Sequence, residues 1–141
     1  MDVALNLLGH RSYSEYKLAK KLSESGIGPE DIYETVIRLK GWGYLNDKEY
    51  GLNRMATLQA RFKSRVFVEG DLLVNGLKPE LIQELLNIYY PESLEIEIAW
   101  QLLRRKSHVK RQSKTWGPAF LMRSGFSENT IHQCFPEVSS T

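Results

Sequence analysis

The chain of 141 residues has almost no cysteine, and Cys134 is the single one. One cysteine excludes an intramolecular disulfide framework and any metal site built from a cysteine cluster. No stretch reaches the roughly 18 to 20 apolar residues that a membrane span needs. The N-terminus also lacks the basic start and apolar run of a secretory signal. We therefore expect no membrane partner and a reducing, intracellular compartment, the cytoplasm.

Residues that carry catalysis are also sparse. His10, His108 and His132 lie far apart in the sequence, and none has the spacing of a metal ligand. No phosphate-binding G-x-x-x-x-G-K-[ST] motif occurs, and Gly41-Trp42-Gly43 does not follow a strand. Cys134 falls on an apolar stripe, which favours a buried thiol over a nucleophile. The sequence predicts no catalytic residue, no metal and no cofactor, so an enzyme is the least supported class.

The charge is small overall, +2, but it is unevenly distributed. Residues 94–141 hold 7 Lys/Arg and 4 Asp/Glu, whereas residues 1–46 hold 6 of each and residues 47–93 hold 6 and 7. No acidic residue occurs from Ile98 to Ser127. A run of one sign attracts anions or acidic surfaces, although a solvated helix face is the simpler reading. This basic run consists of Arg104, Arg105, Lys106, Lys110, Arg111, Lys114 and Arg123.

Apolar residues recur with helical spacing along most of the chain. Ile82, Leu85, Leu86 and Tyr89 are typical, since positions i, i+3, i+4 and i+7 share one face of a helix. Ser12-Tyr13-Ser14-Glu15 fits a capping box, which predicts a helix start there. The best strand candidate, residues 66–68, is short and flanked by helical pattern. The predicted fold class is therefore all-α.

An internal repeat divides the chain into three parts. Gly26, Gly76 and Gly125 are 50 and 49 residues apart, and each has Leu four positions earlier, an apolar residue next and Ile six positions later. This pattern predicts a helix that ends at a glycine with positive φ, followed by a third helix. We expect three-helix repeats over residues 1–46, 47–93 and 94–141, stacked into an elongated, curved solenoid. The alternative is one compact helical domain with coincidental spacing.

Short motifs in this order match a known family. Gly43-Tyr44-Leu45-Asn46-Asp47, with an aromatic residue at Tyr50, follows the first repeat, and residues 120–127 read Phe-Leu-Met-Arg-Ser-Gly-Phe-Ser. Together with the opening Ala4-Leu5-x-Leu7-Leu8, these motifs resemble the RecX regulatory proteins over about residues 3–138. The sequence departs from the family at Asn46 and at Gly51, where a glycine early in a helix is expected to weaken its first turn.

The resemblance implies a monomeric, cytoplasmic modulator of RecA recombinase without catalytic or cofactor-binding residues. Such proteins bind RecA filaments on DNA, inhibit ATPase, strand exchange and co-protease activities, and thereby affect DNA repair and the SOS response. The basic run is the expected contact with DNA or with acidic recombinase surfaces inside the filament. Two alternatives stay open: a stand-alone DNA-binding protein that uses Arg104–Lys114 with Trp116 as a stacking residue, and an adaptor for another partner.

Overall fold

Nine α-helices make up the regular structure in the part of the chain that is described, residues 1–107 and 116–136 of a computed structural model. Within these ranges no strand occurs, so the all-α prediction is confirmed. In chain order the helices are α1 (Asp2–His10), α2 (Glu15–Glu24), α3 (Pro29–Gly41), α4 (Asp47–Ala60), α5 (Arg65–Val74), α6 (Pro79–Tyr89), α7 (Glu92–Ser107), α8 (Trp116–Arg123) and α9 (Glu128–Cys134).

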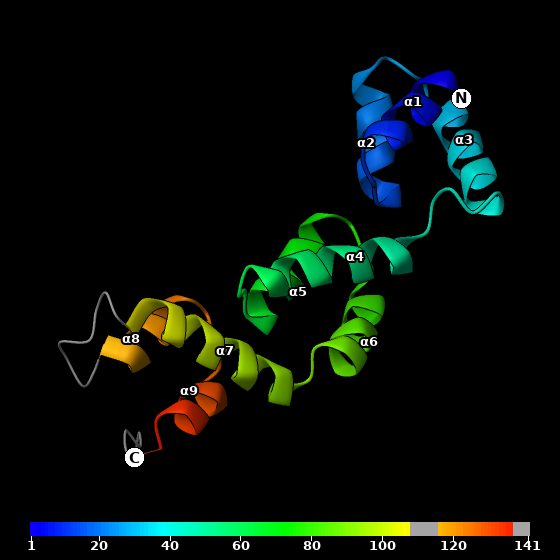
Figure 1. Cartoon of the computed structure of the whole chain (residues 1–141). Helices are drawn as coiled ribbons and strands as arrows, with labels where there is room; N and C mark the ends of the chain where they lie inside the picture. Colours follow the sequence, from blue (N-terminus) through cyan, green and yellow to red (C-terminus); the bar gives the residue numbers. More distant parts are fainter. Residues whose placement is uncertain (108–115, 137–141) are drawn as a thin grey trace.

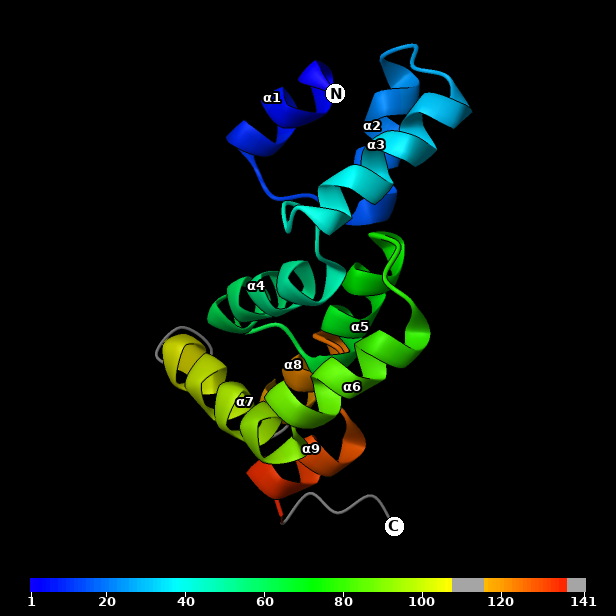
Figure 2. The ribbon, with the colours of Figure 1, turned by 90° about the vertical axis from the view of Figure 1, so that its right-hand side faces the viewer.

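The helices form three tandem three-helix repeats in an elongated molecule. Figure 1 shows α1–α3 at one end, α4–α6 in the middle and α7–α9 at the other end. The view turned by 90° shows the same order from end to end (Figure 2). Successive repeats therefore contact only their neighbours, as expected for a solenoid.

Each repeat turns at its predicted glycine. Gly26, Gly76 and Gly125 have φ of 87°, 86° and 86°, the left-handed region that glycine adopts without a steric penalty. The next residue in each repeat donates its N–H to the carbonyl of the leucine four residues before the glycine, at 3.1 Å in all three turns. The predicted helix ends are confirmed. Pro29 and Pro79 then open the third helix of the first two repeats.

Serine side chains begin the second helices, but one start differs from the prediction. The N-cap of α2 is Ser14, not Ser12, and its hydroxyl accepts the N–H of Lys17 at 3.2 Å. Ser14 is selected because it is fully buried and also donates to the Asn75 carbonyl at 2.6 Å, a contact that the local sequence does not encode. Ser64 has the same place before α5 and accepts from Phe67.

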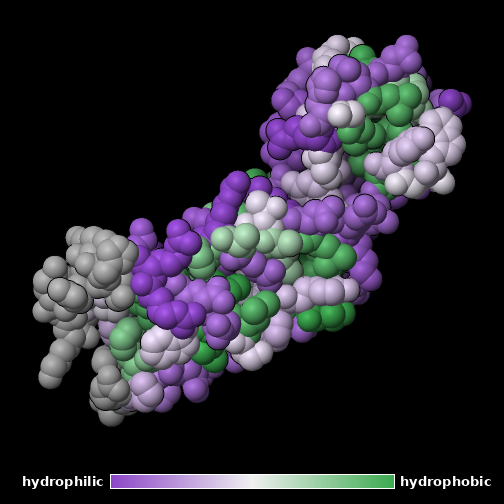
Figure 3. All heavy atoms as spheres, in the orientation of Figure 1, coloured by the Kyte–Doolittle hydropathy of each residue, from purple (hydrophilic) through white to green (hydrophobic). Residues whose placement is uncertain are grey.

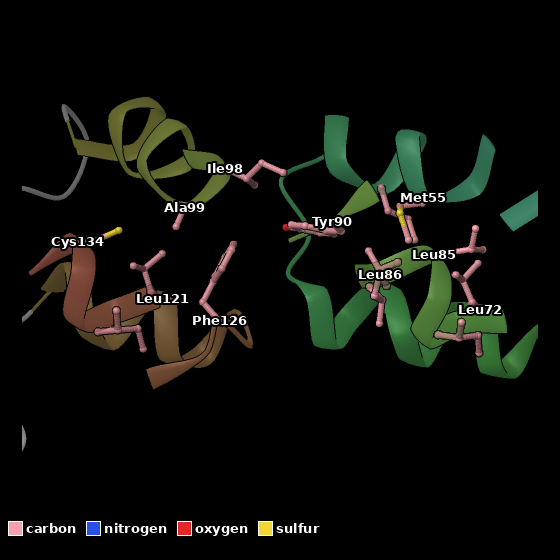
Figure 4. Close-up of a cluster of buried hydrophobic side chains, with 14 of the residues drawn as sticks. Met55, Leu72, Leu85, Leu86, Tyr90, Ile98, Ala99, Leu121, Phe126 and Cys134 are labelled. Carbon is pink, nitrogen blue, oxygen red and sulfur yellow. The ribbon is translucent and has the colours of Figure 1, made fainter. Parts of the chain in front are cut away.

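The buried side chains form two separate cores. The smaller core belongs to the first repeat and contains Leu18, Leu22 and Leu39. The larger core joins the second and third repeats, and Figure 4 shows Tyr90 lying between the side chains of the two. Tyr90 is fully buried, and its hydroxyl donates to the Lys63 carbonyl at 2.7 Å. The second and third repeats thus share one hydrophobic interior.

A glycine inside α4 permits close packing within the second repeat. Gly51 is buried, and a Cβ built there would lie 2.6 Å from Cδ1 of Leu85 and 2.9 Å from Cδ2 of Leu77. The family departure noted at this position therefore has a packing counterpart, because a side chain at residue 51 would make the Leu77 and Leu85 methyl groups shift.

The repeats are joined by one recurring hydrogen bond. The backbone N–H of Glu15, the first residue of α2, donates to Oδ1 of Asp47 in α4 at 2.8 Å. Fifty residues later, the N–H of Arg65 at the start of α5 donates to Oε2 of Glu95 in α7, also at 2.8 Å. The first N–H groups of a helix have no partner inside that helix, so a carboxylate from the next repeat satisfies them.

Glu95 is the more deeply buried of the two joint carboxylates. It is 1% exposed and accepts hydrogen bonds from Arg65, from the Ser127 hydroxyl at 3.1 Å and from the Thr130 hydroxyl at 2.5 Å. A buried carboxylate is tolerated only when it is hydrogen-bonded in this way. Glu95 therefore ties α5, α7 and α9 together.

We expect Gly76→Ala to destabilise the protein more than Gly26→Ala. Both changes place a Cβ at positive φ, which costs about 1 kcal/mol or more. Only at Gly76 would the new Cβ meet a neighbour, 2.2 Å from Cβ of Tyr16, whereas at Gly26 nothing lies within 4 Å. Urea unfolding followed by circular dichroism measures the difference. Equal losses in the two variants would contradict the close packing of Tyr16 on this turn.

Glu95→Ala should lower the free energy of unfolding by about 2 kcal/mol or more, because it leaves the buried Arg65 N–H and two hydroxyls without their acceptor. Glu97→Ala is the matched control, since Glu97 is exposed and, within residues 1–107 and 116–136, accepts a hydrogen bond from Gln101 alone. Urea unfolding followed by circular dichroism measures the loss in each variant. A loss at Glu95 no larger than at Glu97 would show that the joint carboxylate contributes nothing.

Candidate functional site

The described residues of the basic run lie at the ends of two helices of the third repeat. Arg104, Arg105 and Lys106 form the last turn of α7, and Arg123 ends α8. All four are exposed. Hydrophilic side chains gather over this end of α7 in Figure 3. Lys110, Arg111 and Lys114 lie outside the described residues.

The position of these cations at a helix end explains part of their presence. The C-terminus of a helix carries a partial negative charge, and each cation there gains about 0.3–1 kcal/mol. The first turn of α7 contains Glu92 and Glu95, whose negative charges complement the partial positive charge of a helix N-terminus. Arg123 stands in the last turn of α8.

An aromatic ring supports one of these arginines. The guanidinium of Arg105 lies over the Phe62 ring, 5.3 Å from its centroid. Such a cation–π contact contributes about 0.5–1 kcal/mol at an exposed site. It holds Arg105 of the third repeat against the turn between α4 and α5 of the second.

Phe62 itself is the one described non-glycine residue with positive φ, 60°. The left-handed conformation costs a residue with a side chain about 1–2 kcal/mol. Here it ends α4, since the N–H of Lys63 donates to the Leu58 carbonyl at 3.0 Å. The third repeat offsets this cost, because Phe62 packs against the shared core and under Arg105.

Lys63 extends the basic surface into the second repeat. Its ammonium lies 4.7 Å from the centroid of the Phe67 ring, and Phe67 is 44% exposed. Lys63 and Phe62 are consecutive, so the two cation–π pairs are neighbours at the joint. Lys63 is not among the residues that the sequence analysis predicted as a contact. The sequence does contain a signal for it, because basic and aromatic residues alternate in Arg61-Phe62-Lys63, as they do on surfaces that contact nucleic acid.

Trp116, considered for base stacking, and Cys134, considered as a nucleophile, both pack in or against the hydrophobic core. The Trp116 ring stacks on Phe120, with centroids 5.4 Å apart, and packs against the core. Cys134 is buried, and this burial raises the pKa of its thiol to about 11. In residues 1–107 and 116–136 no group of His, Cys, Asp and Glu is arranged to hold a metal ion. His108 lies outside this part of the chain.

No helix among the described residues has the length and apolar character that crossing a membrane requires.

Comparison with known proteins points to one family. A family model described as RecX, first three-helix domain, matches residues 1–39. The regulatory protein RecX of Pelodictyon phaeoclathratiforme is 32% identical over 135 residues, covering 93% of this chain and 83% of that protein. The crystal structure of RecX from Lactobacillus salivarius superimposes with a TM-score of 0.80 at 24% identity, over 97% of this chain and 92% of that one.

Some relatives are longer than this chain. The RecX protein of Caldanaerobacter subterraneus is 28% identical, and the match covers 92% of this chain but 66% of the relative. For the RecX protein of Bacillus cytotoxicus the match covers 52% of the relative.

Cys134 should resist alkylation by iodoacetamide in the folded protein. With a pKa of about 11, roughly one thiol in a thousand is ionised at pH 8, and the thiolate is the reactive form. Mass spectrometry of the intact chain, with and without denaturing urea, measures the reaction. Rapid labelling at pH 8 without urea would show an accessible thiol and would reopen a chemical role for it.

Proposed function

The chain belongs to the RecX family of regulatory proteins, and from that membership we propose that it is a non-enzymatic, cytoplasmic regulator that binds RecA–DNA filaments. It inhibits the ATPase, strand-exchange and co-protease activities of the recombinase. Through this inhibition it modulates DNA repair and the SOS response. It acts as a monomer, with residues 1–46, 47–93 and 94–141 as its three repeats.

The exposed basic surface at the third repeat is the observation that carries the proposal. Arg105 and Lys106 are exposed, and Arg105 lies over Phe62, the residue before Lys63 in the sequence. No acidic residue follows Lys106 in the sequence until Glu128. Surfaces of this kind bind phosphates by releasing condensed counterions, or they bind acidic protein surfaces. The elongated repeat architecture supports the proposal as well, because a long narrow protein fits along a helical filament groove.

A stand-alone DNA-binding protein is the second candidate, and the same basic surface favours it. The two functions differ in what strengthens binding. A DNA-binding protein binds bare single-stranded DNA tightly and loses affinity steeply with salt. A recombinase regulator binds bare DNA weakly and binds more strongly once RecA has assembled on it.

The decisive measurement is the steady-state ATPase of RecA on single-stranded DNA, with increasing amounts of this protein. We expect inhibition, together with binding to the filament that exceeds binding to bare DNA. An unchanged ATPase with tight, salt-sensitive binding to bare DNA would replace this proposal by the second candidate.

The double change Arg105→Glu with Lys106→Glu should reduce inhibition of RecA by about tenfold or more, since charge reversal at a complementary interface costs well over 1 kcal/mol. The melting temperature should fall moderately, because the change removes two cations from the last turn of α7, each worth about 0.3–1 kcal/mol, and the Arg105–Phe62 contact, so inhibition is compared at a temperature at which the variants are folded. Lys20→Glu with Lys21→Glu, two exposed lysines of the first repeat, is the control. Equal losses in both double variants would remove the basic run from the binding surface.

A further inference from the structure

An apolar cleft opens where the first repeat meets the second. It has a volume of about 540 Å³ and is lined mainly by Tyr16 and Ala19 of α2, by Ile32, Tyr33 and Val36 of α3, and by Gly76. Two aromatic rings at the cleft are poorly covered by the protein itself, since Tyr33 is 71% exposed and Tyr16 is 51% exposed. Figure 3 shows hydrophobic side chains reaching the surface of this end of the molecule.

The second repeat shows which residues occupy the positions equivalent to the cleft walls. Ala19 and Tyr33 correspond, fifty residues later, to Glu69 and Gln83. In the second repeat these two side chains form a hydrogen bond of 2.6 Å between α5 and α6, which is compatible with a surface exposed to water. The first repeat has a methyl group and a tyrosine ring at the same places. The fold therefore does not require apolar residues there, so their presence indicates contact with a partner.

The first and second repeats also differ at the end of their third helices. Tyr90 at the end of the second repeat is fully buried, and its hydroxyl reaches the residue before the Ser64 cap. The corresponding residue of the first repeat is Lys40, whose side chain is 53% exposed and pairs with Glu15 at 3.3 Å. An aromatic ring thus covers this region of the second repeat, whereas a half-exposed lysine stands at the cleft of the first.

Charges at the cleft rim indicate which kind of partner fits. Glu15 is paired with Lys40, and Asp47 accepts the Glu15 N–H. Lys78 is exposed, and its charge acts on Asp47, where it opposes the rise in the pKa of that carboxyl. The rim therefore carries two carboxylates and two lysines and has no net charge. Such a rim gives no net attraction to a polyanion such as nucleic acid, whereas the apolar walls suit an apolar side chain of a protein segment.

We propose that this cleft is a docking site for a protein segment that inserts an aromatic or large aliphatic side chain between Tyr16 and Tyr33. Resting on the proposed function, the segment belongs to RecA in its filament. Tyr33 is the anchor, since a large, rigid ring that is 71% exposed offers contact area at little conformational cost. This contact is separate from the basic surface of the third repeat.

Three variants test the proposal. Ala19→Trp fills the cleft from its wall, and Tyr33→Ala removes the anchor without disturbing a buried side chain. Tyr44→Ala is the matched control, because Tyr44 is 61% exposed and lies outside the cleft lining. The affinity of fluorescently labelled protein is measured by anisotropy for RecA filaments on single-stranded DNA and for the bare DNA, and melting temperatures establish folding.

We expect Ala19→Trp and Tyr33→Ala to bind the filament about tenfold or more weakly, with bare DNA binding unchanged and Tyr44→Ala like the wild type. Wild-type affinity for the filament in a folded Tyr33→Ala variant would overturn the cleft proposal alone. Equal losses on bare DNA would also overturn it and assign the cleft to nucleic acid. A wild-type protein that neither binds the filament nor inhibits the ATPase would overturn the proposed function and the cleft proposal together.

Discussion

The hydrogen bond from the first N–H of one repeat's second helix to a carboxylate of the next repeat determines how the molecule is assembled. Glu15 donates to Asp47 and Arg65 donates to Glu95, both at 2.8 Å. The first N–H groups of a helix have no partner inside that helix. The second helix of a repeat therefore presents an N–H group that a carboxylate of the next repeat can accept. Next to this bond the turn at Gly76 lies against Tyr16, and both residues line the adjoining cleft.

The two joints differ in strength for a physical reason. Glu95 is fully buried among three donors and lies beside a core that the second and third repeats share. Asp47 is only partly buried, and burial raises its pKa despite the Glu15 N–H and the nearby lysines. A raised carboxyl pKa means that the folded protein loses stability as pH rises through that value, because the buried group then ionises, although the Glu15 N–H itself favours the ionised form. The first repeat has its own core, and it also meets the second repeat through the Ser14–Asn75 hydrogen bond and through Tyr16 against Gly76.

Local signals in the sequence predicted the local structure, and contacts between repeats decided the rest. The glycine turns and apolar stripes depend on neighbours a few residues away, so helix class and repeat number could be inferred. The start of α2 could not, because Ser14 is chosen through Asn75, 61 residues distant. The positive φ of Phe62 depends on packing in another repeat, under Arg105. The basic run was visible as composition, whereas the cation–π contact of Arg105 with Phe62 in another repeat required the fold.

Two separate contacts on one long chain have a consequence for binding to a filament. The basic surface belongs to the third repeat and its joint with the second, and the cleft lies at the joint between the first and second (Figure 1). On the two proposals above, a filament that repeats the same protomer along its axis would meet the two sites with different protomers. Once one contact formed, the other would be intramolecular and would gain an effective concentration set by the spacing of the repeats. Individually weak contacts would then give tight binding to the assembled filament and weak binding to a single protomer.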